Sequence, residues 1–290
     1  DDLVMPGSWD DVLGPNPSIA ACTAYPELDN GNPSPEYTGY PQGTFCLNVS
    51  VEYKDKVLPI CVDHSFKVIR RWVVTDLCSN EDSTYNQYIT VMDNQPPVCT
   101  APEEFEVGTN TLSCGTSFDV PPPIVIFECS EWDYFVSYKL TDESGNPYQH
   151  ATTDGVVRKS DGSYTITNVP GGQDSVWIVY TIEDVCGNIS QCFTEVVIVD
   201  DEEPVAVCDL HTFVALNEDG WAIAGVNSFD DGSWDNCMLD RMEVRRMTSA
   251  CGISTAWGDH VKFCFADVGK VIQIQLRGWD KAGHSNSCMV

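Results

Sequence analysis

Three stretches of this chain repeat one pattern, and this internal repeat limits the possible folds more than any other sequence feature. Each stretch is an alternating apolar run that ends in Asp and a short turn. The stretches are Trp72-Val-Val-Thr-Asp76-Leu-Cys78-Ser-Asn80, Tyr180-Thr-Ile-Glu-Asp184-Val-Cys186-Gly-Asn188 and Leu276-Arg-Gly-Trp-Asp280-Lys-Ala-Gly-His284. Successive Asp residues are 108 and 96 positions apart (76, 184 and 280). That spacing predicts one small domain per copy.

Acidic, proline-bearing junctions follow the first two copies. They are Val91-Met-Asp93-Asn-Gln-Pro96-Pro97-Val-Cys99 and Val199-Asp200-Asp-Glu-Glu-Pro204-Val-Ala-Val-Cys208. Proline ends a strand and stiffens a linker, so we place domain boundaries near 94 and 201. The predicted domains are residues 1–94, which include an irregular N-terminal segment, residues 95–201 and residues 202–290.

The residues before each repeated Asp alternate with the period of a β-strand. Ile272, Ile274 and Leu276 alternate with polar residues, which gives one apolar and one polar face. The matching core positions are Val176, Ile178, Tyr180 and Ile182 in the second copy, and Trp72 and Val74 in the first. Since no long amphipathic helical run is present, we predict an all-β chain of three tandem antiparallel sandwiches.

The third copy differs from the second at its end. Seven residues, Phe193 to Val199, separate Cys192 from the junction, whereas only Met289 and Val290 follow Cys288. A sandwich with a truncated last strand exposes an open core and an unpaired edge. We therefore expect the chain to be a fragment of a longer repeat protein. The alternative is a strand supplied by a neighbouring subunit.

These residues also carry a resemblance. "KVIRRWVVTDLCSN", "YITVMDNQPPVC" and "YTIEDVCGNISQCFTEVVIVDDEEPVAVC" resemble hyalin-repeat and Ig-like modules of giant bacterial surface proteins. "FDDGSWDNC" and "LRGWDKAGHSNSCMV" are similar to modules in surface proteins of marine Bacteroidota, in particular the Saprospira-like group. The resemblance implies Ig-like sandwiches in a cell-surface protein exported by type IX secretion. Such proteins are gliding adhesins, surface filaments or grappling-hook-like appendages.

The 14 cysteines indicate disulfides. They are scattered and include no C-x-x-C pair, which makes a zinc or redox site a poor interpretation and favours an oxidising compartment outside the cytosol. The resemblance implies the pairs Cys99–Cys192 and Cys208–Cys288. Residues alone suggest three more pairs: Cys61–Cys78, Cys22–Cys46 and Cys129–Cys186. Cys114 and one of Cys237, Cys251 or Cys264 are left for a free thiol, an interdomain bond or an intersubunit bond.

Carboxylates gather in two kinds of place. Asp230, Asp231, Asp235 and Asn236 lie within seven residues and offer the hard oxygen ligands that Ca²⁺ prefers. The alternative is an Asp-rich turn whose carboxylates accept backbone hydrogen bonds. At the junctions, Asp93, Asp200 and Asp201 are candidate Ca²⁺ ligands between domains, and the alternative there is a solvated acidic linker.

Trp132 and Trp234 lie beside cysteines in polar loops, and their rings are candidates for stacking on sugars. Packing onto a disulfide is the alternative for both. Trp72 and Trp177 lie in strand runs and are predicted to be core residues.

Charge and motifs exclude several functions. With 44 acidic and 15 basic residues, the net charge of −29 opposes binding to nucleic acid or anionic lipid, and no apolar stretch predicts membrane insertion. The five histidines are dispersed, and no metalloprotease, nucleophile-elbow, Walker or dinucleotide motif is present. A Cys–His pair assembled by the fold is the remaining catalytic alternative, and we expect no enzyme.

The sequence thus predicts a structural or adhesive segment of an extracellular filament or cell-surface adhesin, which attaches to surfaces or other cells. Its expected partners are copies of itself or neighbouring repeats, and cell-surface glycans. The alternative is a set of carbohydrate-binding modules that accompany a secreted polysaccharide-degrading enzyme.

Overall fold

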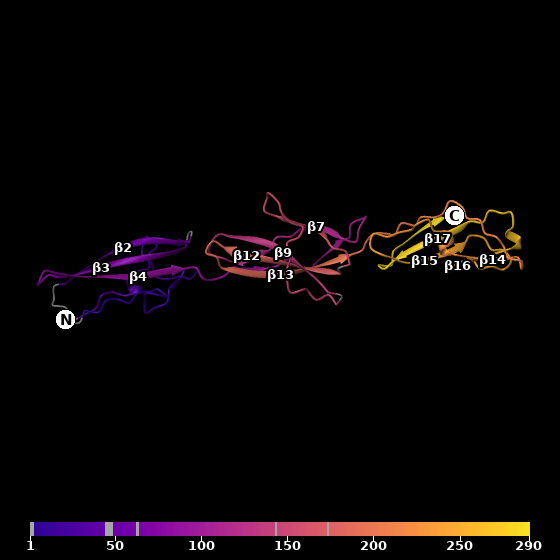
Figure 1. Ribbon diagram of the computed structural model, residues 1–290. Helices are drawn as coiled ribbons and strands as arrows, with labels where there is room; N and C mark the ends of the chain where they lie inside the picture. The colour runs from indigo at the N-terminus through magenta and orange to yellow at the C-terminus, as the bar shows by residue number, and fades with distance from the viewer. Residues whose placement is uncertain (1–2, 44–48, 62–63, 143, 173) are drawn as a thin grey trace. The chain divides into compact units, whose positions relative to one another are not determined.

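The computed structural model describes residues 3–43, 49–61, 64–142, 144–172 and 174–290 (Figure 1). Strand residues make up 50% of the chain and helical residues 4%, and six disulfides join described cysteines. The predicted all-β, disulfide-stabilised fold class is therefore confirmed. The chain forms two compact units, the first of residues 1–102, 123–136 and 180–193, and the second of residues 103–122, 137–179 and 194–290. The division into three domains stays a prediction.

The first unit is built on one four-stranded sheet with the order β1-β4-β3-β2, whose longer strands Figure 1 labels. A separate two-stranded pair, β5-β8, lies in the same unit. The elements that lie wholly in this unit are β1 (Ile19–Ala20), α1 (Pro35–Thr38), β2 (Val49–Cys61), β3 (Ser65–Asp76), β4 (Glu81–Met92), β5 (Val98–Thr100) and β8 (Ile124–Phe127).

Alternation along β3 explains the core of this sheet. Val68, Trp72 and Val74 are buried, and Ile89 of β4 is buried beside them. The indole Nε1 of Trp72 donates to Gln87 Oε1 at 3.0 Å, so the buried N–H is satisfied. The predicted core positions Trp72 and Val74 are thus confirmed. β2 is mostly exposed along its length, as expected of an edge strand.

An irregular segment, rather than a second sheet, covers the buried face of this sheet in the described residues before 94. The amide of Trp9 donates to the carbonyl of Tyr88, and the amide of Thr90 donates to the carbonyl of Trp9, at 2.8 Å and 2.7 Å. The core cluster of Ile19 and Ile89 packs against Trp9 and Tyr25. The segment is rich in proline, which removes ladder donors and explains why it does not form regular strands.

A buried ion pair ties the irregular segment to the sheet. Arg70 has no exposed side-chain surface, and it donates to both carboxylate oxygens of Asp55 at 2.8 Å. Its remaining donors reach Thr38 Oγ1 at 3.0 Å and the carbonyl of Pro33 at 2.7 Å. A buried guanidinium is tolerated only with such complete pairing, so these contacts hold α1 and the loop before it in place.

The second unit contains the remaining short strands and shares three long ones with the first. Its own strands are β6 (Phe105–Gly108), β7 (Thr116–Val120), β10 (Val156–Arg158), β11 (Tyr164–Val169), β14 (Trp221–Gly225), β15 (Leu239–Arg246), β16 (His260–Cys264), β17 (Ile274–Asp280) and β18 (Ser285–Met289). The shared strands are β9 (Trp132–Leu140), β12 (Ser175–Asp184) and β13 (Ile189–Val199).

Sheets β6-β13-β12-β9 and β10-β11-β7 form a sandwich. The rings of Phe105 on β6 and Phe118 on β7 meet edge to face, with centroids 6.0 Å apart. Ile178, Tyr180 and Ile182 have no exposed surface. The predicted inward positions of the second repeat are confirmed, since Val176 is buried as well.

Sheets β14-β16 and β15-β17-β18 enclose the core of the third repeat. The cluster contains residues from both sheets, among them Ala224, Val244, Phe263, Ile274 and Leu276. Ile274 and Leu276 are buried, and the residues that follow each of them, Gln275 and Arg277, are partly exposed. This confirms the period-two pattern on which the strand prediction rests.

A second buried ion pair closes this core. Arg246 donates from Nη1 and Nη2 to the two oxygens of Asp267, at 3.0 Å and 2.8 Å. The carboxylate also accepts the amide of Cys264 at 3.0 Å. The Arg246 hydrogen bonds lower the pKa of Asp267 below its usual value and outweigh burial, which raises it.

Candidate functional site

Three disulfides join residues that the sequence places on opposite sides of a predicted repeat boundary. Cys22–Cys129 and Cys61–Cys186 cross position 94, and both lie within the first compact unit. Cys114–Cys237 crosses position 201 and lies within the second unit. Each predicted boundary is therefore bridged by covalent bonds in addition to the main chain.

The other three disulfides lie inside single predicted repeats. They are Cys99–Cys192, Cys208–Cys288 and Cys251–Cys264. The first two are the pairs that the resemblance implies. Cys114 was a candidate for an interdomain bond, and among its possible partners the structure selects Cys237.

The predicted bridge Cys61–Cys78 is wrong, because the two residues do not bracket one hairpin. Cys61 pairs with Ser65 where β2 turns into β3, whereas Cys78 follows Asp76 at the opposite end of β3. A 12-residue strand separates them, roughly 35–40 Å at the usual rise. A disulfide requires Cα atoms less than about 7 Å apart. Cys78 itself is exposed.

Two further predicted pairs are also wrong. Cys22 bonds Cys129, so it is not the partner of Cys46, which lies outside the described residues. Cys129 and Cys186 do not bond each other, because Cys186 is joined to Cys61. The physical reason is shared: the first unit brings the predicted first and second repeats together, and their cysteines pair across the boundary rather than within each repeat.

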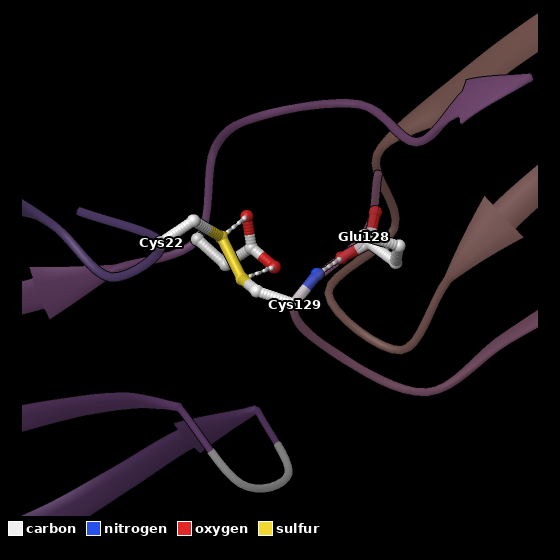
Figure 2. Close-up of side chains that lie close together, drawn as sticks. Cys22, Glu128 and Cys129 are labelled. Carbon is white, nitrogen blue, oxygen red and sulfur yellow. Dashed lines mark hydrogen bonds between the residues drawn. A yellow bond between two sulfur atoms is a disulfide. The ribbon is translucent and has the colours of Figure 1, made fainter. Parts of the chain in front are cut away.

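The predicted ligand Asp93 lies against one of these bridges. Figure 2 shows Cys22 and Cys129 joined through sulfur, with Glu128 beside them. Asp93 is 4% exposed, and its carboxylate oxygens lie 3.3 Å from Cys22 Sγ and 3.5 Å from Cys129 Sγ. Glu128 Oε1 accepts the amide of Cys129 at 2.7 Å. Disulfide sulfurs are not thiolates and do not ligate metals, so this group of four offers a metal only two carboxylates.

The carboxylate of Asp93 has a chemical consequence for its neighbour. Exchange of a disulfide requires attack by an anionic thiolate. A buried negative charge beside both sulfur atoms repels that anion, and it opposes formation of the thiolate that would leave. We therefore expect an ionised Asp93 to slow thiolate attack on the Cys22–Cys129 bridge.

The repeated Asp residues cap the turns that follow their strands. Oδ1 of Asp184 accepts the amides of Cys186 and Asn188, both at 2.8 Å. Oδ1 of Asp280 accepts the amides of Gly283 and His284, at 2.6 Å and 2.8 Å. Asp184 is 5% exposed and Asp280 is 2% exposed. These contacts explain why Asp recurs at this position, since it stabilises a tight turn.

The two junctions differ in their chemistry. At the first, the side-chain amide of Asn188 donates to the carbonyl of Asp93 at 3.1 Å. At the second, carboxylate oxygens of Asp200, Asp235 and Asp280 come within 4.8 Å of one another. Sequence reasoning proposed Asp200 and Asp235 for two separate sites and omitted Asp280. The repeated Asp was itself the signal that could have found it.

The other predicted metal ligands lie elsewhere in the second unit. Asp230 Oδ1 accepts the amide of Ser233 at 2.9 Å. This is the hydrogen bond expected of an Asp-rich turn, the alternative to a Ca²⁺ site in this loop. Asp231 is exposed. Asp201 lies against Gly108, where a Cβ atom would come within 2.6 Å of its carboxylate. Neither Asp230, Asp231 nor Asp201 belongs to the group of three carboxylates in the described residues.

The two candidate sugar-binding tryptophans are partly exposed. Trp132 at the start of β9 is 41% exposed, and Trp234 is 40% exposed. They belong to the first and the second unit respectively. Two other tryptophan rings are covered by arginine: the guanidinium carbon of Arg277 on β17 lies 4.1 Å from the ring centroid of Trp257, in the loop before β16, and 4.6 Å from that of Trp279 on β17. These cation–π contacts stabilise the sheet face.

An apolar groove of about 650 Å³ opens beside the core of the third repeat. Leu210, Phe213 and Val271 on its rim are 91%, 95% and 96% exposed. Phe229 and Val290 also line it. The large exposed side chains make this groove an open apolar surface of the second unit.

No helix in the described part of the chain has the length and apolar character required to cross a membrane.

No protein-family model and no curated protein matches the chain. Solved structures do match. The N-terminal four Ig domains of Dscam1 isoform 7.44 match with a TM-score of 0.38 and 10% identity, over 77% of this chain and 53% of that chain. Isoform 1.9 of the same protein matches with a TM-score of 0.37 and 11% identity, over 83% of this chain and 64% of that chain. The EC1-3 structure of mouse clustered PcdhgC3 matches with a TM-score of 0.31 and 14% identity, over 79% of this chain and 77% of that chain. The chain thus spans about half the length of the first of these structures.

Proposed function

We propose that this chain is a structural segment of an extracellular filament or cell-surface adhesin, in which disulfides fasten neighbouring repeats to one another. The observation that carries the proposal is the set of three bridges across the predicted boundaries, Cys22–Cys129, Cys61–Cys186 and Cys114–Cys237. The resemblance to modules of surface proteins of marine Bacteroidota supports the same function. Stable disulfides also favour an extracellular location, where thiols are not kept reduced.

The bridges set how far the chain can be stretched. A pulling force follows the shortest covalent path between the chain ends. That path runs along residues 1–22 and through the disulfide to Cys129, then back along the chain to Cys114. It passes through the disulfide to Cys237, back along the chain to Cys208, and through the last disulfide to Cys288. It contains only about 70 residues, or roughly 230–250 Å when fully extended. The reduced chain of 290 residues reaches roughly 950–1,050 Å.

Single-molecule pulling between the two termini tests this proposal. We expect the oxidised chain to stop extending near its short covalent path, and reduction to lengthen the final extension about fourfold. Removing Cys22–Cys129 and Cys61–Cys186 together should lengthen the path to about 115–120 residues, because it then runs through Cys99–Cys192 and Cys208–Cys288.

The matched control is Cys251→Ser with Cys264→Ser, since that bridge does not lie on the path. Its final extension should equal that of the unaltered chain. An oxidised chain that extends as far as the reduced one would contradict a mechanical role for the bridges.

The apolar groove supports a neighbouring repeat as the partner. In the second repeat, Phe105–Gly108 of β6 pair in parallel with Val196–Val199 of β13. Aligned on Cys99 and Cys208, residues 214–217 occupy the place of β6 in the third repeat. No strand pairs with residues 214–217 in the part of the chain described here. In the second repeat the partner strand is the repeat's own β13, and here a strand supplied by a neighbouring repeat would take its place.

Supplying such a strand on the same chain should stabilise the second unit. The sequence Glu-Val-Val-Ile-Val of residues 195–199, appended after Val290, should pair with residues 214–217 and cover the groove. Burial of its apolar side chains predicts a gain of about 1–3 kcal/mol after the loss of chain entropy. Urea unfolding and binding of the dye ANS report the gain and the covered surface. A Gly-Ser tail of equal length is the control, and equal behaviour of the two tails would contradict the proposal.

A further inference from the structure

We propose that Asp200, Asp235 and Asp280 bind one Ca²⁺ ion at the predicted junction between the second and third repeats. The three residues are far apart in sequence, and all belong to the second compact unit. Asp200 follows the end of β13, Asp235 lies in the loop before β15, and Asp280 is the last residue of β17. Their carboxylate oxygens lie within 4.8 Å of one another.

The charges of this group are poorly compensated by the protein. Among the described residues, no Lys or Arg forms an ion pair with the three carboxylates, and the imidazole Nδ1 of His284 lies 3.0 Å from Asp280 Oδ2. Asp280 is only 2% exposed, so water screens its charge weakly. Three like charges at this separation repel one another, and a divalent cation between them would turn that repulsion into attraction.

Two unpartnered oxygen atoms supply an independent indication of a ligand. Oδ1 of Asp235 and Oδ1 of Asn236 each expose less than 1 Å² and accept no hydrogen bond from the described residues. Buried oxygens almost always have a partner, because an unmade hydrogen bond is costly. Oδ1 of Asp235, a buried carboxylate oxygen without a donor among the described residues, is therefore free to bind a cation.

The orientations of these two side chains are held by their other atoms. Oδ2 of Asp235 accepts the amides of Cys237 and Met238, both at 2.8 Å. Nδ2 of Asn236 donates to Thr109 Oγ1 at 2.9 Å and to the carbonyl of Asn110 at 3.0 Å. Neither side chain can rotate to satisfy its Oδ1 atom without breaking two hydrogen bonds. The unpartnered oxygens are therefore built into the loop.

The donor set selects the ion. Carboxylates are hard oxygen ligands, and they can bind through one or both oxygen atoms. Ca²⁺ accepts six to eight such ligands in irregular geometry, whereas Mg²⁺ requires a near-ideal octahedron and retains its waters. Three carboxylates from three separate loops fit the first requirement better. The bound ion would tie the junction residue Asp200 to the loops of the third repeat.

Calorimetric titration of the oxidised chain 1–290 tests the site. After treatment with EDTA and exchange into calcium-free buffer, CaCl₂ should bind with a stoichiometry of one and raise the melting temperature. Asp235→Asn and Asp280→Asn should each weaken binding about tenfold or more, since each removes a charged ligand. Both variants keep an oxygen that can accept the turn amides. Their melting temperatures in EDTA show whether they fold like the unaltered chain.

The control is Asp231→Asn, which removes the same charge from the same loop outside the acidic group. Its affinity for Ca²⁺ should be unchanged. If Asp231→Asn weakens binding while Asp235→Asn and Asp280→Asn do not, the local Asp-rich loop is the site and the proposal is wrong. Absence of both heat and a thermal shift with CaCl₂ would overturn it as well, as would binding of ZnCl₂ but not CaCl₂. Each of these outcomes is independent of the pulling experiment.

Discussion

Asp267→Ala is expected to lower the free energy of unfolding by about 3–5 kcal/mol, because it leaves the charge of Arg246 buried without its carboxylate counterion. The Arg246 side chain has no exposed surface, and Asp267 accepts two of its hydrogen bonds. The same substitution removes the acceptor for the amide of Cys264. Urea unfolding followed by tryptophan fluorescence measures the loss.

The control for this variant is Asp119→Ala. Asp119 also pairs with a cation, Lys159, at 2.7 Å, but its side chain is 74% exposed. Water and salt screen such a pair, so we expect a loss much smaller than that of Asp267→Ala. Equal losses in the two variants would show that Arg246 remains solvated after Asp267 is removed, and would contradict the buried-charge explanation.

The effect of Asp267→Ala should also depend on pH. The pKa of Asp267 is lowered in the folded protein by the hydrogen bonds from Arg246. A carboxyl group with a lowered folded-state pKa stabilises the protein above its unfolded pKa, about 4. That stabilisation is lost as the pH falls through the folded-state value. The difference between the variant and the unaltered chain should therefore shrink in acid.

Cys208→Ala with Cys288→Ala is expected to cost about 4–5 kcal/mol. The bridge closes a loop with a sequence separation of 80 residues, so removing it returns much conformational freedom to the unfolded chain. Both cysteines also pack against the core of the third repeat. Urea unfolding of the two oxidised proteins measures the difference.

Cys251→Ala with Cys264→Ala is the comparison for this variant. Its bridge spans a separation of 13 residues, and the loop model predicts a smaller cost of about 3 kcal/mol. A loss equal to or larger than that of the Cys208–Cys288 variant would show that loop length does not decide the stabilisation here.

Strand positions could be predicted from the sequence because they depend on neighbours two residues apart. Ile178, Tyr180 and Ile182 lie two residues apart on one face of a strand, and a sandwich must bury that face. The first 43 residues resisted the same argument. Their prolines prevent regular pairing, so their role as the cover of the first sheet depends on Trp9 and Tyr25 packing onto it.

The disulfides show where local reasoning ends. The pairs Cys99–Cys192 and Cys208–Cys288 follow from a resemblance between modules, each of which contains both partners. Cys61 was assigned to Cys78 because the two are near in sequence, yet a full strand separates them. Its true partner, Cys186, is 125 residues away. Distances of that kind are set by the packing of one repeat on another, which no spacing of cysteines reveals.

By itself, the sequence determined that this chain is all-β, which alternating residues of its repeated strands face the cores, and that most of its cysteines form disulfides. These properties follow from period-two burial and from the chemistry of thiols in an oxidising compartment. Only the tertiary structure decided that three bridges cross the predicted boundaries, and that Asp280 joins Asp200 and Asp235. Both depend on which loops and strand ends meet in space. A disulfide or an ion site forms between residues that are close in the folded structure, whatever their separation along the chain.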